Sequence, residues 1–243
     1  MSRALSSAGG CDEPRRVRIR AITFDYGGTL DGEASHWLDR FVALYAEAGV
    51  EVPFERLKTA FYRADDEAYA NAGVRAMGLE ELMDFHVGVQ LRVLERRDAA
   101  LHALLRDRFV ERSRAALSAS RRLLEELAGR YRLGVISNFY GNVERILRDA
   151  GFAPLLAVVS DSHLLGASKP DRRIFDRTVA GLGVAAQETL HVGDSYERDV
   201  VAGRAAGLRT AWLAGSVGNA RAGGAEDLRL ASLSELTTLL DVT

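Results

Sequence analysis

The strongest constraint on the fold is a strand pattern that begins once, is interrupted, and resumes only after a long helical stretch. Residues 17–25 start with alternation and become an apolar run ending at Asp25, which is typical of a strand that enters a buried sheet. From about Ala34 to Ser118, apolar residues recur at intervals of three and four, which predicts four helices and no strand. After Ser120, helix and strand patterns alternate to the end of the chain.

Alternating helices and strands predict parallel βαβ units in an α/β domain. The first strand has no helix–strand partner of its own nearby, so we expect it to join the later sheet across the helical stretch. The predicted fold is a three-layer, Rossmann-like parallel sheet core formed by residues 17–31 and 119–243, with an all-helical cap inserted over residues 32–118. Residues 1–16 are rich in Ser, Gly, Pro and Arg without periodicity, which predicts a disordered tail.

The composition of the chain limits the kinds of binding partner and compartment that we expect. The chain has 32 basic and 34 acidic residues and a formal net charge of −2, which provides no electrostatic footprint for nucleic acid or an anionic membrane. No apolar run approaches the roughly 20 residues that span a bilayer, and the first residues lack the apolar region of a secretory signal. The single cysteine, Cys11, excludes an intramolecular disulfide framework and fits a reducing compartment. We expect a cytoplasmic protein with neither nucleic-acid nor membrane partners, and the sequence indicates no oligomeric state.

Four predicted strands are followed by polar residues of a consistent kind. These are Asp25, Ser137 with Asn138, Lys169, and Asp194. Ligands of open parallel sheets bind beyond the carboxyl ends of the strands, so we expect these side chains to converge. Carboxylates are the hard oxygen ligands that Mg²⁺ prefers, whereas Lys169 and the Ser137 hydroxyl can neutralise phosphoryl oxygens. Gly27 and Gly28 let backbone N–H groups approach the same oxygens. The pattern therefore predicts a phosphate and metal site.

The order of these residues resembles the haloacid dehalogenase-like (HAD) superfamily. The family motifs are D-x-D-x-T, a Ser or Thr after a strand, a Lys, and G-D-x(3,4)-D. The matching residues here are Asp25-Tyr26-Gly27-Gly28-Thr29, Ser137, Lys169-Pro170, and Gly193-Asp194 with Asp199. The resemblance covers about residues 17–243, and the helical stretch after the first motif is similar to the family's C1 cap, which closes over the site.

The resemblance implies a role for each matching residue. Asp25 would be the nucleophile that forms an aspartyl-phosphate, which splits hydrolysis into two easier steps. Lys169 and Ser137 would act in catalysis with it, and the phosphoryl group of a small phosphorylated substrate would be held by Gly28, Thr29, Ser137, Asn138 and Lys169. Mg²⁺ would be bound by Asp25, Asp194 and the carbonyl of Gly27, with Asp199 supporting the metal shell or Lys169.

One departure from the family pattern affects the chemistry. The family's second aspartate, which protonates the leaving oxygen and later activates water, is replaced here by Gly27. Loss of a general acid–base costs about 10²–10⁴-fold in rate. Candidates for a replacement lie just past the motif, at Asp31, Glu33 and His36, and His36 is attractive because imidazole exchanges protons near neutral pH.

Several functions remain open at this point. The favoured one is a Mg²⁺-dependent phosphohydrolase with an atypical acid–base group. A haloacid dehalogenase also lacks the second aspartate and shares the Ser-Asn pair, but it needs no metal, so the intact Gly193-Asp194 and Asp199 argue against it. Phosphonatase-like cleavage would use a cap lysine as a Schiff base, and Lys58 is the only lysine there. A phosphate-binding protein with little or no turnover is a further alternative, although retention of Asp25 favours chemistry.

Overall fold

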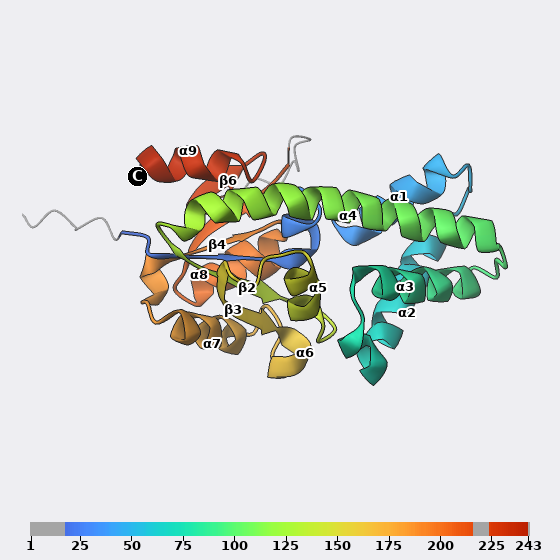
Figure 1. Ribbon diagram of the computed structural model, residues 1–243, viewed down its shortest axis with the longest axis horizontal. Coiled ribbons are helices and arrows are strands. Elements are labelled where there is room, and N and C mark those ends of the chain that lie inside the picture. Colours follow the sequence, from blue (N-terminus) through green and yellow to red (C-terminus); the bar gives the residue numbers. More distant parts are fainter. Residues whose placement is uncertain (1–17, 216–223, 243) are drawn as a thin grey trace, which may run out of the picture.

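Six parallel strands form one sheet, in the order β3-β2-β1-β4-β5-β6 (Figure 1). The computed structural model describes residues 18–215 and 224–242, so the tail predicted over residues 1–16 lies outside the described part. The strands are β1 Ala21–Phe24, β2 Arg132–Ser137, β3 Leu156–Asp161, β4 Thr189–Gly193, β5 Arg209–Leu213 and β6 Leu228–Leu230. The predicted parallel α/β architecture is therefore confirmed, including the weak last strand.

The first strand lies in the middle of the sheet. Ala21 is in register with Arg132 of β2 on one side and with Thr189 of β4 on the other, although both partners are more than a hundred residues away in sequence. All four residues of β1 are buried. A strand covered on both faces gains most from apolar side chains at every position, which explains its continuous apolar run.

Helices cover both faces of this sheet and make three layers. Figure 1 shows α4 and α9 on one side of the sheet and α7 and α8 on the other. The helices beyond β2 are α5 Val143–Asp149, α6 Ser162–Leu165, α7 Arg172–Leu182, α8 Ala202–Ala205 and α9 Glu235–Val242. Alternate residues of β2 serve the two layers, because Val135 packs in the larger core and Ile136 packs against Phe175 of α7.

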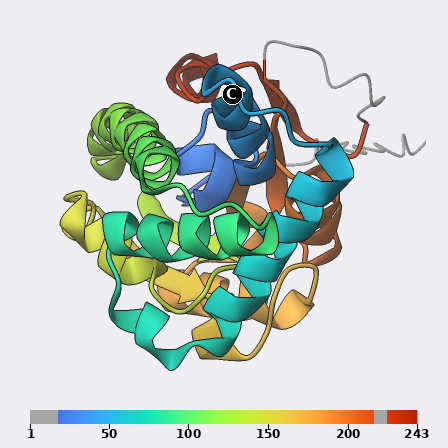
Figure 2. The same cartoon turned by 90° about the vertical axis from the view of Figure 1, so that its right-hand side faces the viewer.

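Four helices form an insertion between β1 and β2, as the periodicity predicts. They are α1 Trp37–Glu47, α2 Phe54–Ala70, α3 Leu79–Val93 and α4 Ala99–Ala128. Figure 2 looks onto this insertion and shows α2 and α3 side by side in front of the sheet. Apolar side chains of the insertion and of one sheet face belong to the same buried cluster, so the two parts share a core.

The end of the insertion differs from the prediction. The sequence analysis separates a helix ending near residue 118 from another beginning near residue 120, whereas α4 is one continuous helix of 30 residues. The sequence around Ser120 contains no Gly or Pro that would break a helix. Ser120 instead uses its hydroxyl to donate a hydrogen bond to the Leu30 carbonyl at 2.8 Å. The expected boundary at residues 118 and 119 therefore falls inside a rigid element that reaches from the insertion to the sheet.

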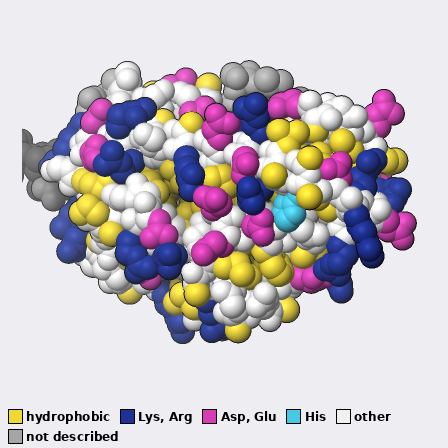
Figure 3. Space-filling model, turned by 45° about the vertical axis from the view of Figure 1, so that its right-hand side comes forward, with side chains coloured by type: hydrophobic (Ala, Val, Ile, Leu, Met, Phe, Trp, Pro, Cys, Tyr) yellow, Lys and Arg dark blue, Asp and Glu magenta, His cyan; other side chains and the backbone are white. Residues whose placement is uncertain are grey.

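The surface carries charges of both signs. Figure 3 shows basic and acidic side chains interspersed on the face in view. Among the described residues, no helix combines the length and the apolarity that a membrane crossing requires.

Candidate active site

Three neighbouring strands bring the predicted site residues to one edge of the sheet. Asp25 follows β1 directly, Ser137 ends β2, and Asp194 follows β4. Since β1 pairs with both β2 and β4, the carboxyl ends of these strands lie side by side. Lys169 reaches the same edge from the loop between α6 and α7. The topology thus assembles residues that are as far apart as 25 and 194 in the chain.

A buried charge cluster occupies this edge. The Lys169 ammonium lies 2.7 Å from Asp25 Oδ1 and 2.5 Å from Asp199 Oδ1. Carboxylate oxygens of Asp25, Asp194 and Asp199 all lie within 4.8 Å of one another. Asp25, Asp199 and Lys169 are each at least nine-tenths buried, so water screens these interactions only weakly.

The surroundings shift the protonation of the three carboxyl groups differently. Burial raises the pKa of Asp25, which Lys169 opposes and Asp199 reinforces. Burial also raises the pKa of Asp194 well above its usual range, and repulsion from Asp25 and Asp199 adds to this. For Asp199, burial acts in the same direction, but Lys169 and His191 outweigh it and hold the pKa well below its usual range. Lys169 lowers the pKa of Asp194 only in part, and among the described residues Asp194 is the one carboxylate of the three that forms no ion pair with Lys169.

The donor set of this cluster fits Mg²⁺. Three carboxylates face one ammonium, which leaves an excess of negative charge that a divalent cation would neutralise. The backbone is also shaped around Asp194, because a Cβ on Gly28 would come within 2.5 Å of Asp194 Oδ2. Gly28 adopts a φ of +86°, a conformation that glycine reaches without strain. Asp25 and Asp194 are therefore the residues that could hold the ion, beside the Gly27 loop.

The residues predicted to bind phosphate surround the cluster. Thr29 is buried and its Oγ1 donates to Asp194 Oδ1 at 3.2 Å, so it orients that carboxylate. Asn138 fixes the Lys169 loop twice, since its Nδ2 donates to the Lys169 carbonyl at 2.9 Å and its Oδ1 accepts from the Lys169 N–H at 2.7 Å. Ser137 and Asn138 both line the cavity beside the cluster.

That cavity has a volume of about 380 Å³ and lies between the sheet edge and the helical insertion. The insertion contributes polar and aromatic side chains to its wall, namely His36, Trp37, Phe61, Asp65, Asp66 and Tyr69. Gly27 leaves its part of the wall open, because a Cβ there would have only Trp37 Nε1 within 4 Å, at 3.8 Å.

The three candidate acid–base residues lie in different places. His36 lines the cavity and caps the N-terminus of α1, where its Nδ1 accepts a hydrogen bond from the Leu38 N–H at 3.2 Å. An accepting Nδ1 places the ring proton on Nε2. Glu33 is exposed in a turn and does not line the cavity.

Asp31 is fully buried away from the cavity wall. Its carboxylate accepts hydrogen bonds at 2.8 Å from the Gly28 N–H and from Trp37 Nε1, and it forms an ion pair with Arg40. The sequence analysis therefore misplaces Asp31 and Glu33, because the first is committed to a buried cation and the second points to solvent.

Two neighbours of the charge cluster, His191 and Ser195, are not among the site residues that the sequence analysis names. His191 Nε2 lies 3.1 Å from Asp199 Oδ1, and its Nδ1 lies 3.0 Å from Thr23 Oγ1 on the neighbouring strand. The Ser195 N–H donates to Asp199 Oδ2 at 3.0 Å. The signal that could have found His191 is a polar ring within a fully buried strand, since such a group needs partners.

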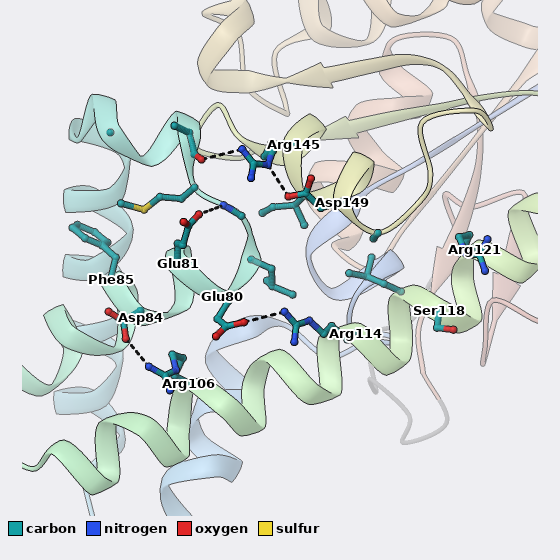
Figure 4. A pocket seen from close by; sticks show the side chains of 18 residues that line it. Glu80, Glu81, Asp84, Phe85, Arg106, Arg114, Ser118, Arg121, Arg145 and Asp149 are labelled. Carbon is teal, nitrogen blue, oxygen red and sulfur yellow. Dashed lines mark hydrogen bonds and ion pairs between the residues drawn. The ribbon is translucent and has the colours of Figure 1, made fainter.

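A larger hollow of about 1230 Å³ lies elsewhere, bounded by α3, α4 and α5 (Figure 4). Its charged side chains largely neutralise one another, in the pairs Arg106–Asp84 at 3.0 Å, Arg114–Glu80 at 3.0 Å and Arg145–Asp149 at 2.6 Å. It contains none of the residues that follow the strands. We therefore place the candidate site at the smaller cavity.

Lys58 lies outside the smaller cavity. Its ammonium is 3.7 Å from Glu55 on the same helix, and the side chain is 43% exposed. It does not line the wall that faces Asp25. The lysine that phosphonatase-like chemistry requires is thus not supplied by Lys58.

Sequence comparison finds curated relatives that match most of this chain. The human haloacid dehalogenase-like hydrolase domain-containing protein 3 is 31% identical over 219 residues, which cover 82% of this chain and 84% of the relative. The N-acetylmuramic acid 6-phosphate phosphatase of Pseudomonas putida is 28% identical over 199 residues, covering 80% of this chain and 82% of the relative. Several other curated relatives are matched over only 31% to 53% of their length.

Solved structures share the fold. The HAD-hydrolase YfnB of Bacillus subtilis, bound to magnesium, superposes with a TM-score of 0.58 at 22% identity, covering 92% of this chain and 99% of that one. A 2-haloacid dehalogenase of Pseudomonas syringae superposes with a TM-score of 0.52 at 24% identity over the same shares of the two chains. The family model for haloacid dehalogenase-like hydrolases matches residues 19–207. The chain belongs to the haloacid dehalogenase-like hydrolases.

Proposed function

We propose that this chain is a Mg²⁺-dependent phosphohydrolase that acts on a small phosphorylated molecule through an aspartyl-phosphate on Asp25. The observation that carries the proposal is the placement of Asp25 Oδ1 2.7 Å from the Lys169 ammonium, within 4.8 Å of the Asp194 and Asp199 carboxylates. A nucleophilic carboxylate beside one fixed cation and a set of metal-binding oxygens suits attack on a phosphoryl group. The similarity to a protein named as a phosphatase supports the same chemistry.

Each residue of the cluster has a distinct part in this proposal. Asp25 attacks phosphorus, and Lys169 neutralises the charge on the phosphoryl oxygens. Backbone and side-chain donors hold those oxygens, supplied by Gly28, Thr29, Ser137 and Asn138. Mg²⁺, held by Asp25, Asp194 and the Gly27 carbonyl, would supply electrostatic stabilisation of the transferring group. Asp199 keeps the Lys169 ammonium in place through the 2.5 Å contact.

The reaction proceeds in two displacements. An Asp25 oxygen forms a bond to phosphorus while the bond to the leaving oxygen breaks, and the leaving oxygen takes up a proton. Water then attacks the aspartyl-phosphate, which releases inorganic phosphate and restores the Asp25 carboxylate. Gly27 cannot move a proton in either step. We assign that task to His36 at the cavity wall. To protonate a leaving oxygen from Nε2, its ring must first take up a proton on Nδ1 and give up the hydrogen bond from the Leu38 N–H. The neutral ring that remains after the transfer is protonated again as the hydrolysing water loses its proton.

The helical insertion acts as a cap in this proposal. Residues 32–118 form most of it, residues 17–31 and 119–243 form the catalytic core, and the continuous α4 joins the two parts. The insertion supplies about a third of the residues that line the cavity, including His36, Asp65 and Tyr69. These side chains face the part of the substrate that leaves, so they determine which phosphate ester is accepted.

A dehalogenase is the second candidate, because its chemistry also uses a nucleophilic aspartate without a carboxylate at the position of Gly27. The three-carboxylate cluster argues for the phosphatase, since carboxylates clustered around a single ammonium favour a metal ion. A non-catalytic phosphate-binding protein would gain nothing from placing Asp25 against an anionic ligand.

The deciding experiment is a substrate screen with and without Mg²⁺ on wild type and on Asp25→Asn, covering sugar phosphates, nucleotides, acyl phosphates and 2-haloacids. We expect Mg²⁺-dependent release of phosphate by wild type and none by Asp25→Asn, with an unchanged circular dichroism spectrum. Asp176→Asn, in the exposed pair with Arg172, is the matched control and should keep full activity. If Asp25→Asn retains most of the activity, Asp25 is not the nucleophile. Metal-independent turnover of 2-haloacids would show that the protein is a dehalogenase. Tight binding of phosphate esters without turnover would show that it is a binding protein.

A further inference from the structure

One carboxylate of the cavity wall is anchored from behind by two hydrogen bonds. Asp65, on α2, accepts at its Oδ1 from the hydroxyl of Tyr140 and from His86 Nε2, which is 3.1 Å away. Tyr140 belongs to the loop that follows β2, so its hydrogen bond joins the insertion to the sheet edge. The Asp65 carboxylate is thus held by one donor from the insertion and one from the sheet edge.

Both donors hold their protons. Gln90 Nε2 lies 2.8 Å from His86 Nδ1, and because an amide nitrogen can only donate, the proton of the His86 ring is on Nε2. His86 is fully buried and stacks on Phe41 with 5.5 Å between the ring centroids, which fixes its orientation. Burial and the facing Asp65 carboxylate raise the pKa of Tyr140 well above its usual range, so the phenol also remains a donor.

The second carboxylate oxygen of Asp65, Oδ2, does not take part in these two hydrogen bonds. Within the described residues, Oδ2 has no recorded hydrogen-bond partner, while Asp65 lines the cavity and its side chain is 26% exposed. Neither donor on Oδ1 is a Lys or Arg, and among the described residues no Lys or Arg forms an ion pair with Asp65. Asp65 therefore presents a rigid, charged hydrogen-bond acceptor to whatever fills the cavity.

We propose that Asp65 is a specificity-determining residue that accepts a hydrogen bond from a hydroxyl or ammonium group on the leaving part of the substrate. This inference rests on the proposed phosphohydrolase function and narrows its substrate to phosphate monoesters of small alcohols that carry such a donor. Asp65 and the adjacent Asp66 repel a second phosphate or a carboxylate at this end of the cavity. The cations of the cavity wall are Lys169 and Arg198, both on the core side, so the phosphoryl end is drawn to that side, where the carboxylate cluster would also hold Mg²⁺.

The test compares three phosphate esters of similar size: propyl phosphate, 2-hydroxyethyl phosphate and 2-aminoethyl phosphate. We expect wild type to prefer at least one donor-bearing ester over propyl phosphate by about tenfold or more in kcat/KM, because a hydrogen bond to a charged group is being gained. Asp65→Asn replaces the accepting Oδ2 by a donor or a neutral oxygen and should reduce the preference to within about threefold. Whichever of the two donor esters is favoured identifies hydroxyl or ammonium.

Two further variants separate specificity from damage to the fold. Asp66→Asn removes the same charge one residue away and should keep the preference for the donor-bearing ester. If Asp66→Asn loses this preference, the overall negative charge of the cavity wall is responsible and not Asp65 Oδ2. Tyr140→Phe keeps Oδ2 but removes one anchor, and should raise KM for the favoured ester more than KM for propyl phosphate. Equal use of the three esters by wild type, or an unchanged preference in Asp65→Asn, overturns the proposal.

Failure of the proposed function has a different signature. If neither the esters nor p-nitrophenyl phosphate is hydrolysed, the phosphohydrolase assignment is wrong. Whenever the three esters are not hydrolysed, whether or not p-nitrophenyl phosphate is, they are titrated calorimetrically against wild type and Asp65→Asn. If wild type binds a donor-bearing ester preferentially and Asp65→Asn does not, the role of Asp65 in recognition is supported even without turnover. If wild type shows no such preference, the role of Asp65 is contradicted.

Discussion

Asp31 and Arg40 form a buried ion pair, with 3.1 Å between Asp31 Oδ2 and Arg40 Nη1. The aspartate lies in the turn that follows the Asp25 loop, and the arginine lies on α1. Arg40 also donates to Ser113 Oγ on α4 at 2.6 Å. The chain leaves the sheet for the insertion at Asp31. Through Arg40, the Asp31 carboxylate ties this point to both the first and the last helix of the insertion.

This pair predicts a large loss of stability in Asp31→Asn. The variant removes one charge and leaves the Arg40 guanidinium buried without a counter-ion, which costs about 3–5 kcal/mol. Urea unfolding followed by circular dichroism measures the change in the free energy of unfolding. Asp176→Asn, which breaks the exposed pair with Arg172, is the control and should change stability hardly at all. A loss no larger than that of the control would show that Asp31 contributes little to holding the insertion.

The strand-end residues of the site could be predicted, whereas the role of Asp31 could not. Asp25, Ser137 and Asp194 each end a strand whose apolar pattern is visible in the sequence, and parallel strands end at one edge. Asp31 is also an aspartate and lies only six residues after Asp25. Its role, however, depends on Arg40, nine residues further on, and no local sequence pattern pairs the two. Both aspartates are buried, but Asp25 lines the cavity whereas Asp31 does not, and tertiary packing decides this difference.

Mg²⁺ binding is predicted to depend on Asp194. Three carboxylates share one ammonium in this cluster, so removal of one ligand charge should weaken Mg²⁺ binding by at least about tenfold in Asp194→Asn. Calorimetric titration of the substrate-free protein with MgCl₂ measures this directly. Asp66→Asn is the matched control, since it removes a cavity carboxylate outside the cluster and should leave the Mg²⁺ affinity within about threefold. Equal Mg²⁺ affinity in wild type and Asp194→Asn would remove Asp194 from the metal site.

Gly28→Ala is predicted to disturb the same carboxylate without changing any charge. The added Cβ would lie 2.5 Å from Asp194 Oδ2, and an alanine at a φ of +86° costs about 1–2 kcal/mol of backbone strain. We expect weaker Mg²⁺ binding and at least a tenfold lower kcat/KM for p-nitrophenyl phosphate. Gly129→Ala, where no atom lies within 4 Å of the added Cβ, should match wild type in both measurements. Wild-type behaviour of Gly28→Ala would mean that the loop moves aside at no cost.

Long-range polar pairs are the part of the site that sequence patterns do not indicate. Asp65 and Tyr140 are 75 residues apart and lie in different parts of the fold. Helical periodicity places Asp65 on α2 but does not say which face meets the sheet edge. His191 is different, because register places it opposite Thr23 once the order of the strands is known. Sheet topology can therefore be used to find some partners, whereas contacts between the insertion and the core require the structure.

The last prediction concerns the missing carboxylate at position 27. Gly27 has φ −73° and ψ 116°, a conformation open to any residue, and a Cβ there would meet only Trp37 Nε1 at 3.8 Å. The Cβ of an aspartate therefore fits without strain, and a protonated carboxyl group at this position would donate its proton to the leaving oxygen. We expect Gly27→Asp to raise the hydrolysis of alkyl phosphates by up to about 10²-fold. Aryl and acyl phosphates should gain much less, because their departing oxygens need little protonation.

Gly27→Asn is the matched control, since it fills the same space without a proton to transfer, and it should leave the preference for good leaving groups unchanged. His36→Ala then shows where the proton comes from in wild type. If wild type already hydrolyses alkyl and aryl phosphates at similar rates and His36→Ala loses only the alkyl activity, His36 has taken over the acid–base role. If instead wild type strongly prefers aryl phosphates and His36→Ala does not change this, no side chain replaces the aspartate, and the rate of the enzyme is set by the leaving group alone.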